Sequence, residues 1–276
     1  MNSLSNDMND HDLTIALEAV EKAGAYLREA YERFEVIPDA PATISTEADR
    51  QSQEIILGRL SRAFPGDAFA AEEATAFMKD ARRSGERLWI VDPIDGTRGF
   101  ARKNGEFSVM VGLVEKGEIR VGVVHQPAVG RWTYATRGGG CWRRDVGMAK
   151  AEACRVTCVS TLAEATLTQS RSREPGRRSR WAEALQPARI VESYSAGIKL
   201  ALVARGEADI YLNTYEAFSD WDICAGHILV TEAGGKVTGA KGQTIVYGGL
   251  GARQEHGLLA TNGKLHEAAL KRIGAA

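Results

Sequence analysis

Two aspartates stand three positions apart at the end of an apolar run in the first half of the chain. The run, Leu88 to Val91, has the pattern of a buried strand, and Asp92-Pro-Ile-Asp95-Gly-Thr follows it directly. Carboxylate and carbonyl oxygens gathered at one strand end suit a hard divalent cation, and the amides of a turn suit a phosphate group. An ordinary turn is the alternative, because proline, aspartate and glycine are common turn residues.

Three other acids also stand where predicted elements begin or end. Asp49 belongs to Thr46-x-x-Asp49 before an amphipathic helix, and Glu72 follows the short apolar run 68–71. Asp222 lies in the first turn of a predicted helix. Each has a structural explanation as well: a capping box for Asp49, an ordinary surface position for Glu72, and a favourable interaction with the helix dipole for Asp222. Taken singly, these acids do not identify a site.

The elements that must position the acids fall into two groups along the chain. Apolar residues at helical spacing predict a helix over 12–34 and a second helix over 55–64. Apolar runs joined by two-residue turns predict an antiparallel meander over 107–134. With the strand that ends before Asp92, these elements form a predicted N-terminal α+β sub-domain, residues 1–148, which carries most of the candidate metal ligands.

The pattern changes at a polar stretch, 143–153, which is the predicted boundary between sub-domains. Beyond it, short strands alternate with helices, as expected of an α/β sub-domain spanning residues 149–276. The apolar segment 196–204 predicts a helix that ends at Gly206. Another predicted helix is headed by Ser219-Asp-Trp-Asp222 and ends at Gly234-Gly235. This C-terminal part is expected to complete the site.

The composition is that of a soluble globular protein, with 44% hydrophobic and 26% charged residues in 276. Lysine plus arginine number 35 against 36 acids, so no overall field would attract a nucleic acid polymer or a membrane. No segment approaches the roughly 20 apolar residues that cross a bilayer, and we expect a cytoplasmic protein with reduced cysteines. The basic segment Arg171–Arg180 is either a contact for a polyanionic substrate or an exposed loop.

Five short motifs occur together in a specific order along the chain. They are Thr46-x-x-Asp49, Glu72-Glu73, Asp92-Pro-Ile-Asp-Gly-Thr97, Trp221-Asp-x-x-Ala-Gly226 and Glu232-Ala-Gly-Gly235. This order resembles the inositol monophosphatase superfamily, which comprises lithium-sensitive, magnesium-dependent phosphatases, and the resemblance extends from Leu13 to Asn262. It implies an α+β fold, a layered α/β/α/β/α sandwich of the inositol monophosphatase and fructose-1,6-bisphosphatase type.

The resemblance also implies which residues hold metal ions. Glu72, Asp92 and the carbonyl oxygen of Ile94 are expected to hold one Mg²⁺. Asp92, Asp95 and Asp222 are expected to hold a second. A cluster of carboxylates would repel a phosphate monoester unless cations lay between them, so the metal ions and the substrate are expected to bind together.

The catalytic residues implied by the resemblance are Asp49, Thr97 and Glu72. Asp49 is expected to orient the hydroxyl of Thr97, which helps to deprotonate a water molecule activated by Mg²⁺. The backbone amides of Gly96 and Thr97 are expected to bind the phosphate group. A third, weaker Mg²⁺ is expected near Glu72 and Asp49, which makes two or three ions in each site.

Local residues favour one branch of the superfamily. Arg98-Gly-Phe100 and Lys103-Asn-Gly-Glu-Phe107 resemble the 3′(2′),5′-bisphosphate nucleotidases, which convert adenosine 3′,5′-bisphosphate to AMP and phosphate. Nucleotidase relatives often carry lysine where Lys199 stands, and this cation is expected to bind the second phosphate; a solvated lysine on the helix surface is the alternative. Asn213 replaces the glutamate that is usual in inositol phosphatases. The residues expected to contact the substrate are Asp95, Gly96, Thr97, Lys199 and Asp222.

Two alternatives to the nucleotidase remain open from the sequence. One is an inositol-1-monophosphatase or histidinol-phosphatase of broad specificity. The other is a catalytically silent phosphate-binding protein on the same fold, although retention of all the acids argues against silence. In each case the expected partner is a small phosphorylated metabolite, and the chain is expected to be a monomer or a homodimer.

Overall fold

The computed structural model describes residues 2–171, 178–215, 218–249 and 252–275, and it divides them into helices and short strands. The helices are α1 (Asn2–Arg33), α2 (Glu47–Ala63), α3 (Ala76–Asp80), α4 (Thr97–Ala101), the 3₁₀ turn η1 (Leu162–Glu164), α5 (Arg180–Leu185), α6 (Ala196–Ala204), α7 (Asp220–Glu232) and α8 (His266–Ala275). The strands are β1 (Ala68–Ala71), β2 (Arg87–Asp95), β3 (Ser108–Glu115), β4 (Glu118–Gln126), β5 (Arg131–Thr136), β6 (Gly140–Asp145), β7 (Glu152–Ala153), β8 (Thr166–Gln169), β9 (Arg189–Glu192), β10 (Ile210–Asn213), β11 (Phe218–Ser219), β12 (Lys236–Thr238), β13 (Arg253–Gln254) and β14 (Leu258–Thr261).

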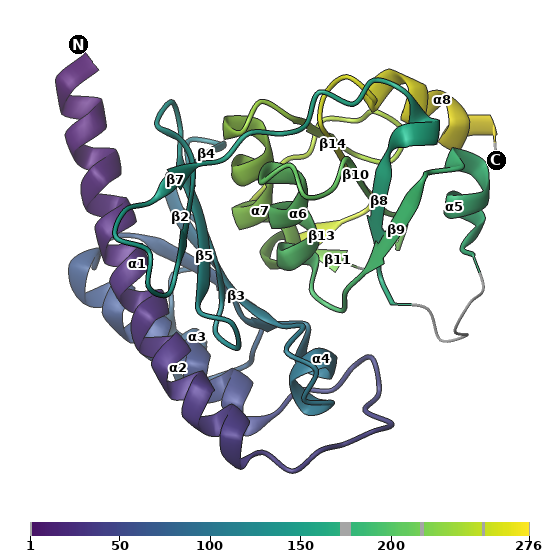
Figure 1. Ribbon diagram of the computed structural model, residues 1–276. Helices are drawn as coiled ribbons and strands as arrows, with labels where there is room; N and C mark the ends of the chain where they lie inside the picture. The colour runs from purple at the N-terminus through teal and green to yellow at the C-terminus, as the bar shows by residue number, and fades with distance from the viewer. Residues whose placement is uncertain (1, 172–177, 216–217, 250–251, 276) are drawn as a thin grey trace.

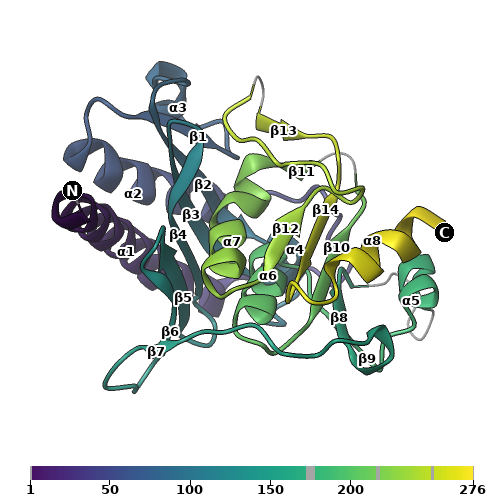
Figure 2. The ribbon, with the colours of Figure 1, turned by 90° about the horizontal axis from the view of Figure 1, so that it is seen from above.

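These elements stack in five layers (Figure 1). Helices α1 and α2 cover one face of a seven-stranded sheet with the order β1-β2-β3-β4-β5-β6-β7. Helices α6 and α7 cover its other face and, as Figure 2 shows from above, lie between this sheet and a second one. The second sheet has five strands in the order β12-β14-β10-β8-β9, and its outer face packs against α5 and α8. The predicted α+β fold with a layered α/β/α/β/α sandwich is therefore confirmed.

Both faces of the first sheet are covered, which is why its strands read as nearly continuous apolar runs. In β3, Val109, Val111 and Leu113 pack in the core that includes α1 and α2. Met110 and Val114 alternate with them and pack in the core that includes α6 and α7. Strand β2 pairs with β3, so its end also lies between the layer of α1 and α2 and the layer of α6 and α7.

Strand β2 continues further than its sequence pattern predicts. It runs from Arg87 through Asp95 instead of ending before Asp92, and its pairing with β3 is irregular between Asp92 and Asp95. An irregularity of this kind re-aims the side chains of the bulged strand. The motif does contain a turn, but only at Gly96, whose φ is 86° and which directly precedes α4.

The predicted antiparallel meander is confirmed in β3 to β6. Lys116 and Gly117 form the two-residue turn between β3 and β4, with φ of 51° and 82°. Positive φ at both positions matches the tight turns whose twist suits a hairpin. The same sheet also contains a parallel pair, β1 with β2, which the sequence pattern did not indicate.

Several element boundaries differ from those predicted. Helix α1 begins at Asn2, earlier than the predicted residue 12, because the polar residues before the apolar stripe carry no periodic signal. Helix α6 matches the predicted range 196–204, and Gly206 follows it with φ of 69°. Strand β7 pairs with β6 although it lies beyond residue 148, so the first sheet includes chain from both proposed sub-domains. We retain the division into residues 1–148 and 149–276 as a proposal.

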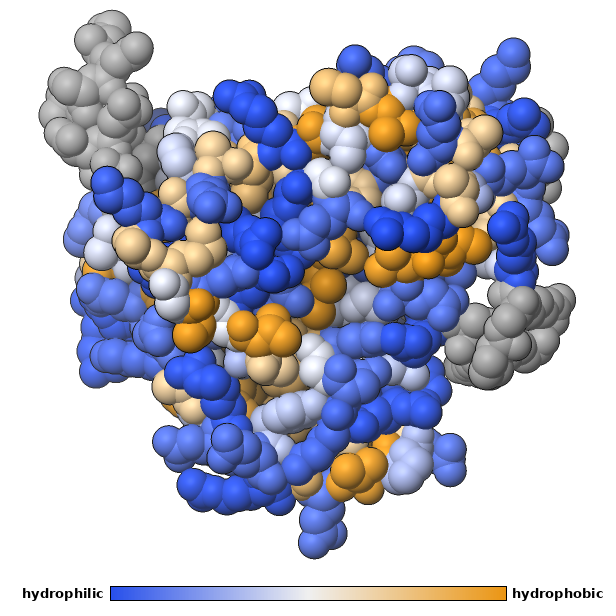
Figure 3. Space-filling view, in the orientation of Figure 1, coloured by the Kyte–Doolittle hydropathy of each residue, from blue (hydrophilic) through white to orange (hydrophobic). Residues whose placement is uncertain are grey.

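The surface is mixed in character. Figure 3 shows hydrophilic residues over most of one face, with smaller hydrophobic patches between them. Within the described chain, no helix has both the length and the apolar character that a membrane crossing requires. Cys141, Cys154, Cys158 and Cys224 are free cysteines; three of them are buried, whereas Cys158 is exposed.

Candidate active site

Three aspartates from two distant segments come together at one point. Asp92 and Asp95 lie at the end of β2, and Asp222 lies in the first turn of α7. One carboxylate oxygen of each lies within 4.8 Å of those of the other two. Oxygen atoms this close to one another are suited to sharing a divalent cation.

Helix α7 reaches this point because it packs closely against the first sheet. Gly122 in β4 faces the helix, and a Cβ atom there would lie 2.4 Å from the carbonyl oxygen of Ala225 and 2.3 Å from Cγ2 of Ile228. Such distances are too short for any side chain, so glycine is the residue that allows this approach. Because Gly122 has no side chain, α7 packs close to the sheet, and this brings Asp222 near the end of β2.

Asp95 is held by the first turn of α6 and by two serines. The N–H of Ala196 donates to its Oδ1 at 3.0 Å, and the N–H of Gly197 donates to its Oδ2 at 2.7 Å. The hydroxyls of Ser108 and Ser195 also donate to Oδ2. The positive end of α6 favours a carboxylate, so Asp95 connects β2 to the middle helical layer. The sequence patterns did not indicate that either serine contacts Asp95. The only sequence signal was that Ser195 stands at the N-cap position of the predicted helix.

The clustered acids repel one another in a poorly hydrated environment. Burial, followed by repulsion from Glu72 and Asp95, holds the pKa of Asp92 well above its usual range. Burial raises the pKa of Asp222 to about 7, and repulsion from Asp95 acts in the same direction. Glu72 is exposed, as its surface explanation predicts, but the protein packed near it and the charges of Asp222 and Asp49 raise its pKa to about 8.

A divalent cation fits this donor set. Asp92 Oδ1 is buried and, among the described residues, has no hydrogen-bond partner. A buried carboxylate oxygen without a partner is unfavourable, and so is a cluster of acids without a compensating charge. A hard cation held by oxygen ligands would relieve both, and Mg²⁺ prefers such ligands.

Asp49 both caps helix α2 and contacts the hydroxyl of Thr97, the two arrangements that the sequence left open. Its Oδ2 accepts hydrogen bonds from the N–H and the hydroxyl of Thr46, at 2.8 and 2.6 Å, which complete the capping box of α2. Its Oδ1 lies 2.8 Å from the hydroxyl of Thr97, which is also 3.0 Å from the carbonyl oxygen of Ile94. Burial raises the pKa of Asp49. The capping box is confirmed, and the same side chain fixes the Thr97 hydroxyl near the acids.

Comparison with known proteins gives the family of this chain. Residues 8–275 match the inositol monophosphatase family. The chain belongs to this family. It is 33% identical over 273 residues to a histidinol-phosphatase of Mycobacterium tuberculosis, which covers 97% of this chain and 100% of that protein. It is 31% identical over 209 residues to the 3′(2′),5′-bisphosphate nucleotidase CysQ of Salmonella typhimurium, which covers 76% of this chain and 80% of that protein. The solved structure of the Thermotoga maritima IMPase matches with a TM-score of 0.78 at 29% identity, covering 96% of this chain and 97% of that one.

Membership of the inositol monophosphatase family identifies the chain as a phosphoric monoester hydrolase. The family resemblance drawn from the motifs is therefore confirmed. The names of the relatives differ in substrate, so membership alone does not select one phosphate ester. The choice among these substrates therefore depends on the residues that surround the clustered acids.

Lys199 does not lie on the surface of its helix, where the alternative prediction of a solvated lysine placed it. The residue is 1% exposed, so the prediction of a solvated lysine is wrong. Its ammonium donates to the carbonyl oxygen of Ser193 at 2.9 Å, to the hydroxyl of Ser170 at 3.4 Å and to the carbonyl oxygen of Tyr194 at 3.5 Å. Burial lowers the pKa of Lys199 to about 8. Lys199 therefore holds the loop before α6, and its contact with a second phosphate stays a prediction.

The basic segment Arg171–Arg180 lies partly outside the described residues, which omit 172–177. At one end of it, Arg171 donates to Glu106. At the other end, the guanidinium of Arg180 lies 4.0 Å from the ring centroid of Trp181. Both described ends thus contact protein side chains.

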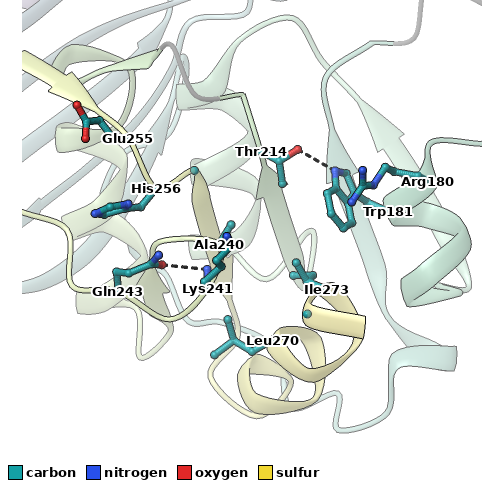
Figure 4. Close-up of a pocket in the computed structure, with 12 residues that line it drawn as sticks. Arg180, Trp181, Thr214, Ala240, Lys241, Gln243, Glu255, His256, Leu270 and Ile273 are labelled. Atoms are coloured by element: carbon teal, nitrogen blue, oxygen red, sulfur yellow. Dashed lines mark hydrogen bonds between the residues drawn. The ribbon is translucent and has the colours of Figure 1, made fainter. Parts of the chain in front are cut away.

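A cavity of about 660 Å³ lies in a different place from the acids (Figure 4). Arg180 and Trp181 from α5 and Leu270 and Ile273 from α8 line it, and Trp181 Nε1 donates to the hydroxyl of Thr214 at 2.8 Å. Its lining contains none of the candidate metal ligands. The size of a cavity therefore does not identify the reactive site of this protein.

Proposed function

We propose that this member of the inositol monophosphatase family is a Mg²⁺-dependent 3′(2′),5′-bisphosphate nucleotidase, which hydrolyses adenosine 3′,5′-bisphosphate to AMP and phosphate. The observation that carries the hydrolytic chemistry is the meeting of Asp92, Asp95 and Asp222, whose oxygens lie within 4.8 Å of one another. The hydrogen bond of 2.8 Å between Thr97 and Asp49 supports the same chemistry. Together they provide ligands for a cation and an oriented hydroxyl.

The acids form two overlapping ligand sets in this proposal. Glu72, Asp92 and the carbonyl oxygen of Ile94 would hold one Mg²⁺, and Asp92, Asp95 and Asp222 would hold a second. The buried, unpartnered Oδ1 of Asp92 supports its place in both sets, since it has no hydrogen bond to another described residue. When bound, Mg²⁺ supplies positive charge to the phosphoryl and leaving oxygens and lowers the pKa of water.

Asp49 and Thr97 handle the proton of the attacking water. The Thr97 hydroxyl accepts this proton as it passes its own proton to Asp49 Oδ1, 2.8 Å away. Thr46 donates to the other oxygen of Asp49 and keeps the carboxylate in place, while the raised pKa of Asp49 suits a proton acceptor. The backbone amides of Gly96 and Thr97 would bind phosphoryl oxygens, and a third, weaker Mg²⁺ would lie near Asp49 and Glu72.

The choice of a nucleotide rests on residues that follow Thr97. Arg98-Gly-Phe100 and the segment 103–107 resemble the nucleotidases, and similarity to CysQ supports the same choice. Asn213, at the end of β10, stands where inositol phosphatases usually have glutamate. Similarity to a histidinol-phosphatase over 97% of the chain supports histidinol phosphate as the second candidate substrate.

Phosphate release in the presence of Mg²⁺ tests this proposal. Adenosine 3′,5′-bisphosphate, inositol 1-phosphate and histidinol phosphate are compared at equal concentration, with Asp92→Asn as the variant that should lose activity on all three. We expect kcat/KM for the nucleotide to exceed the other values by about tenfold or more. A higher value for inositol or histidinol phosphate would reject the nucleotide and keep the phosphatase. Absence of Mg²⁺-dependent release from every ester would favour a silent phosphate-binding protein.

A further inference from the structure

Three arginines surround the ring of Tyr194, in the loop before α6. The guanidinium carbons of Arg98, Arg102 and Arg171 lie 5.3, 5.9 and 5.7 Å from its ring centroid. Arg98 lies in α4, Arg102 directly follows that helix, and Arg171 follows β8. We call these three residues the arginine cluster, and they bring cations from distant segments to one aromatic ring.

The arginine cluster adjoins the acids of the candidate active site. Tyr194 directly precedes Ser195, whose hydroxyl donates to Asp95. Gly96 follows Asp95 with φ of 86°, and a Cβ atom on it would lie 3.1 Å from the nitrogen of Ser195. Arg98 stands two residues further along the chain. A substrate with one phosphate at the acids therefore has the arginine cluster beside it.

The arginine cluster carries more positive than negative charge. Glu106 is the carboxylate that pairs with it, accepting from Arg171 Nε at 3.0 Å and from the N–H of Tyr194 at 3.2 Å. Arg98 Nε is buried and has no hydrogen-bond partner within the part of the chain that the structure describes. Arg102 is exposed to solvent. The charge of Glu192 also acts on Arg171. Among the described residues, two carboxylates beside three guanidinium groups still leave cationic charge available to an anion.

Guanidinium groups recognise phosphate through paired N–H donors, and a buried donor without a partner is unfavourable until a ligand meets it. We propose that the arginine cluster is the subsite for the second phosphate of a bisphosphorylated substrate, with Arg98 and Arg102 as its specificity-determining residues. In this proposal the arginine cluster takes the role predicted for Lys199, whose ammonium is buried and donates to carbonyl oxygens of the loop. The assignment rests on the proposed nucleotidase function and names the residues that distinguish a bisphosphate from a monophosphate.

Two adenosine nucleotides test the subsite. Adenosine 3′,5′-bisphosphate and adenosine 3′-monophosphate share the scissile 3′-phosphate and differ only in the 5′-phosphate. The ratio of their kcat/KM values should fall about tenfold in Arg98→Met and again in Arg102→Met, chiefly through the KM of the bisphosphate. Methionine keeps an apolar stem beside Tyr194 and removes the charge. Lysine at either position should restore part of the ratio, because it keeps the charge without the paired donors.

Arg155→Met is the matched control. Arg155 is exposed and precedes Val156, whose N–H donates to Ala233 at the C-terminal end of α7. Helix α7 has 13 residues, so this end is about 20 Å from the acid-bearing end. The control should leave the ratio unchanged, and the Tm of each variant reports folding. If Arg98→Met does not fold, Arg102→Met, at an exposed position, still carries the test.

Two outcomes would overturn the proposal in different ways. An unchanged ratio in the double variant Arg98→Met, Arg102→Met, with both nucleotides still hydrolysed, would refute the subsite and leave the nucleotidase intact. Hydrolysis of histidinol phosphate but of neither nucleotide would refute the proposed function and the subsite with it. The same phosphate-release assay separates the two.

Discussion

In the absence of metal ions, the acids of the candidate active site should lower the stability of this protein as the pH rises through neutrality. Burial raises the pKa of Asp222 to about 7, and the packed protein and neighbouring acids raise that of Glu72 to about 8. The unfolded chain loses both protons near about pH 4. The folded chain therefore binds more protons than the unfolded chain between these limits, and stability is lost as the pH rises through the folded-state pKa values.

The difference between wild type and Asp222→Asn isolates the contribution of Asp222 between about pH 6.5 and 8. Burial lowers the pKa of His125 to about 3, that of His227 and His266 to about 4 and that of Lys199 to about 8, and these groups act in the opposite direction in both proteins. Across the interval, Asp222 contributes a loss of about 0.8 kcal/mol. We therefore expect the free energy of unfolding to fall by about 0.8 kcal/mol more in wild type than in Asp222→Asn across the interval, so that the Tm of wild type should fall by about 2 °C more.

Thermal melting in EDTA at the two pH values measures this fall. Mg²⁺ should raise the Tm more at the higher pH, because the cation binds the ionised acids. Asp222→Asn is the control: it removes one titrating acid and keeps an acceptor for the N–H of Ser219, so it should reduce the pH dependence. An equal dependence of Tm on pH in wild type and Asp222→Asn would refute the argument that burial and mutual repulsion keep Asp222 protonated.

Three further substitutions test separate parts of the structure. Thr97→Val should lower kcat by about 100-fold or more, because it removes the hydroxyl that bonds to Asp49, whereas Thr97→Ser should retain most activity in a phosphate-release assay. Gly122→Val should lower the free energy of unfolding by about 1–3 kcal/mol and weaken Mg²⁺ binding in calorimetry, because α7 must move away from the sheet. Lys199→Met should lower the free energy of unfolding by about 1–3 kcal/mol, measured by denaturant titration, because buried carbonyl oxygens such as that of Ser193 lose their donor.

Each of these substitutions also has a result that would contradict its reasoning. Wild-type kcat in Thr97→Val would remove this hydroxyl from proton transfer. Unchanged Mg²⁺ affinity in Gly122→Val would mean that the close packing of α7 does not set the position of Asp222. Unchanged stability in Lys199→Met would mean that the ammonium does not hold the loop before α6.

The sequence by itself determined the family, the layered fold and the acids that could form the site. Asp92-Pro-Ile-Asp95-Gly-Thr is a local motif, and its order with four other motifs was enough to identify the family. The apolar run before Asp92 predicted a buried strand, and apolar runs joined by two-residue turns predicted the meander over 107–134, because burial pattern and turn geometry are properties of neighbouring residues. Even there, the continuation of β2 through Asp95 was missed, since pairing with β3 overrides the local turn signal.

Only the tertiary structure decided how these acids meet and what surrounds them. Asp222 reaches β2 because Gly122 lets α7 lie close to the sheet, and a glycine within a strand carries no local sign of that contact. The support of Asp95 by Ser195 and the burial of Lys199 likewise depend on how α6 packs. Contacts between segments far apart in sequence follow from the spacing of whole layers, and that spacing is set by packing throughout the core.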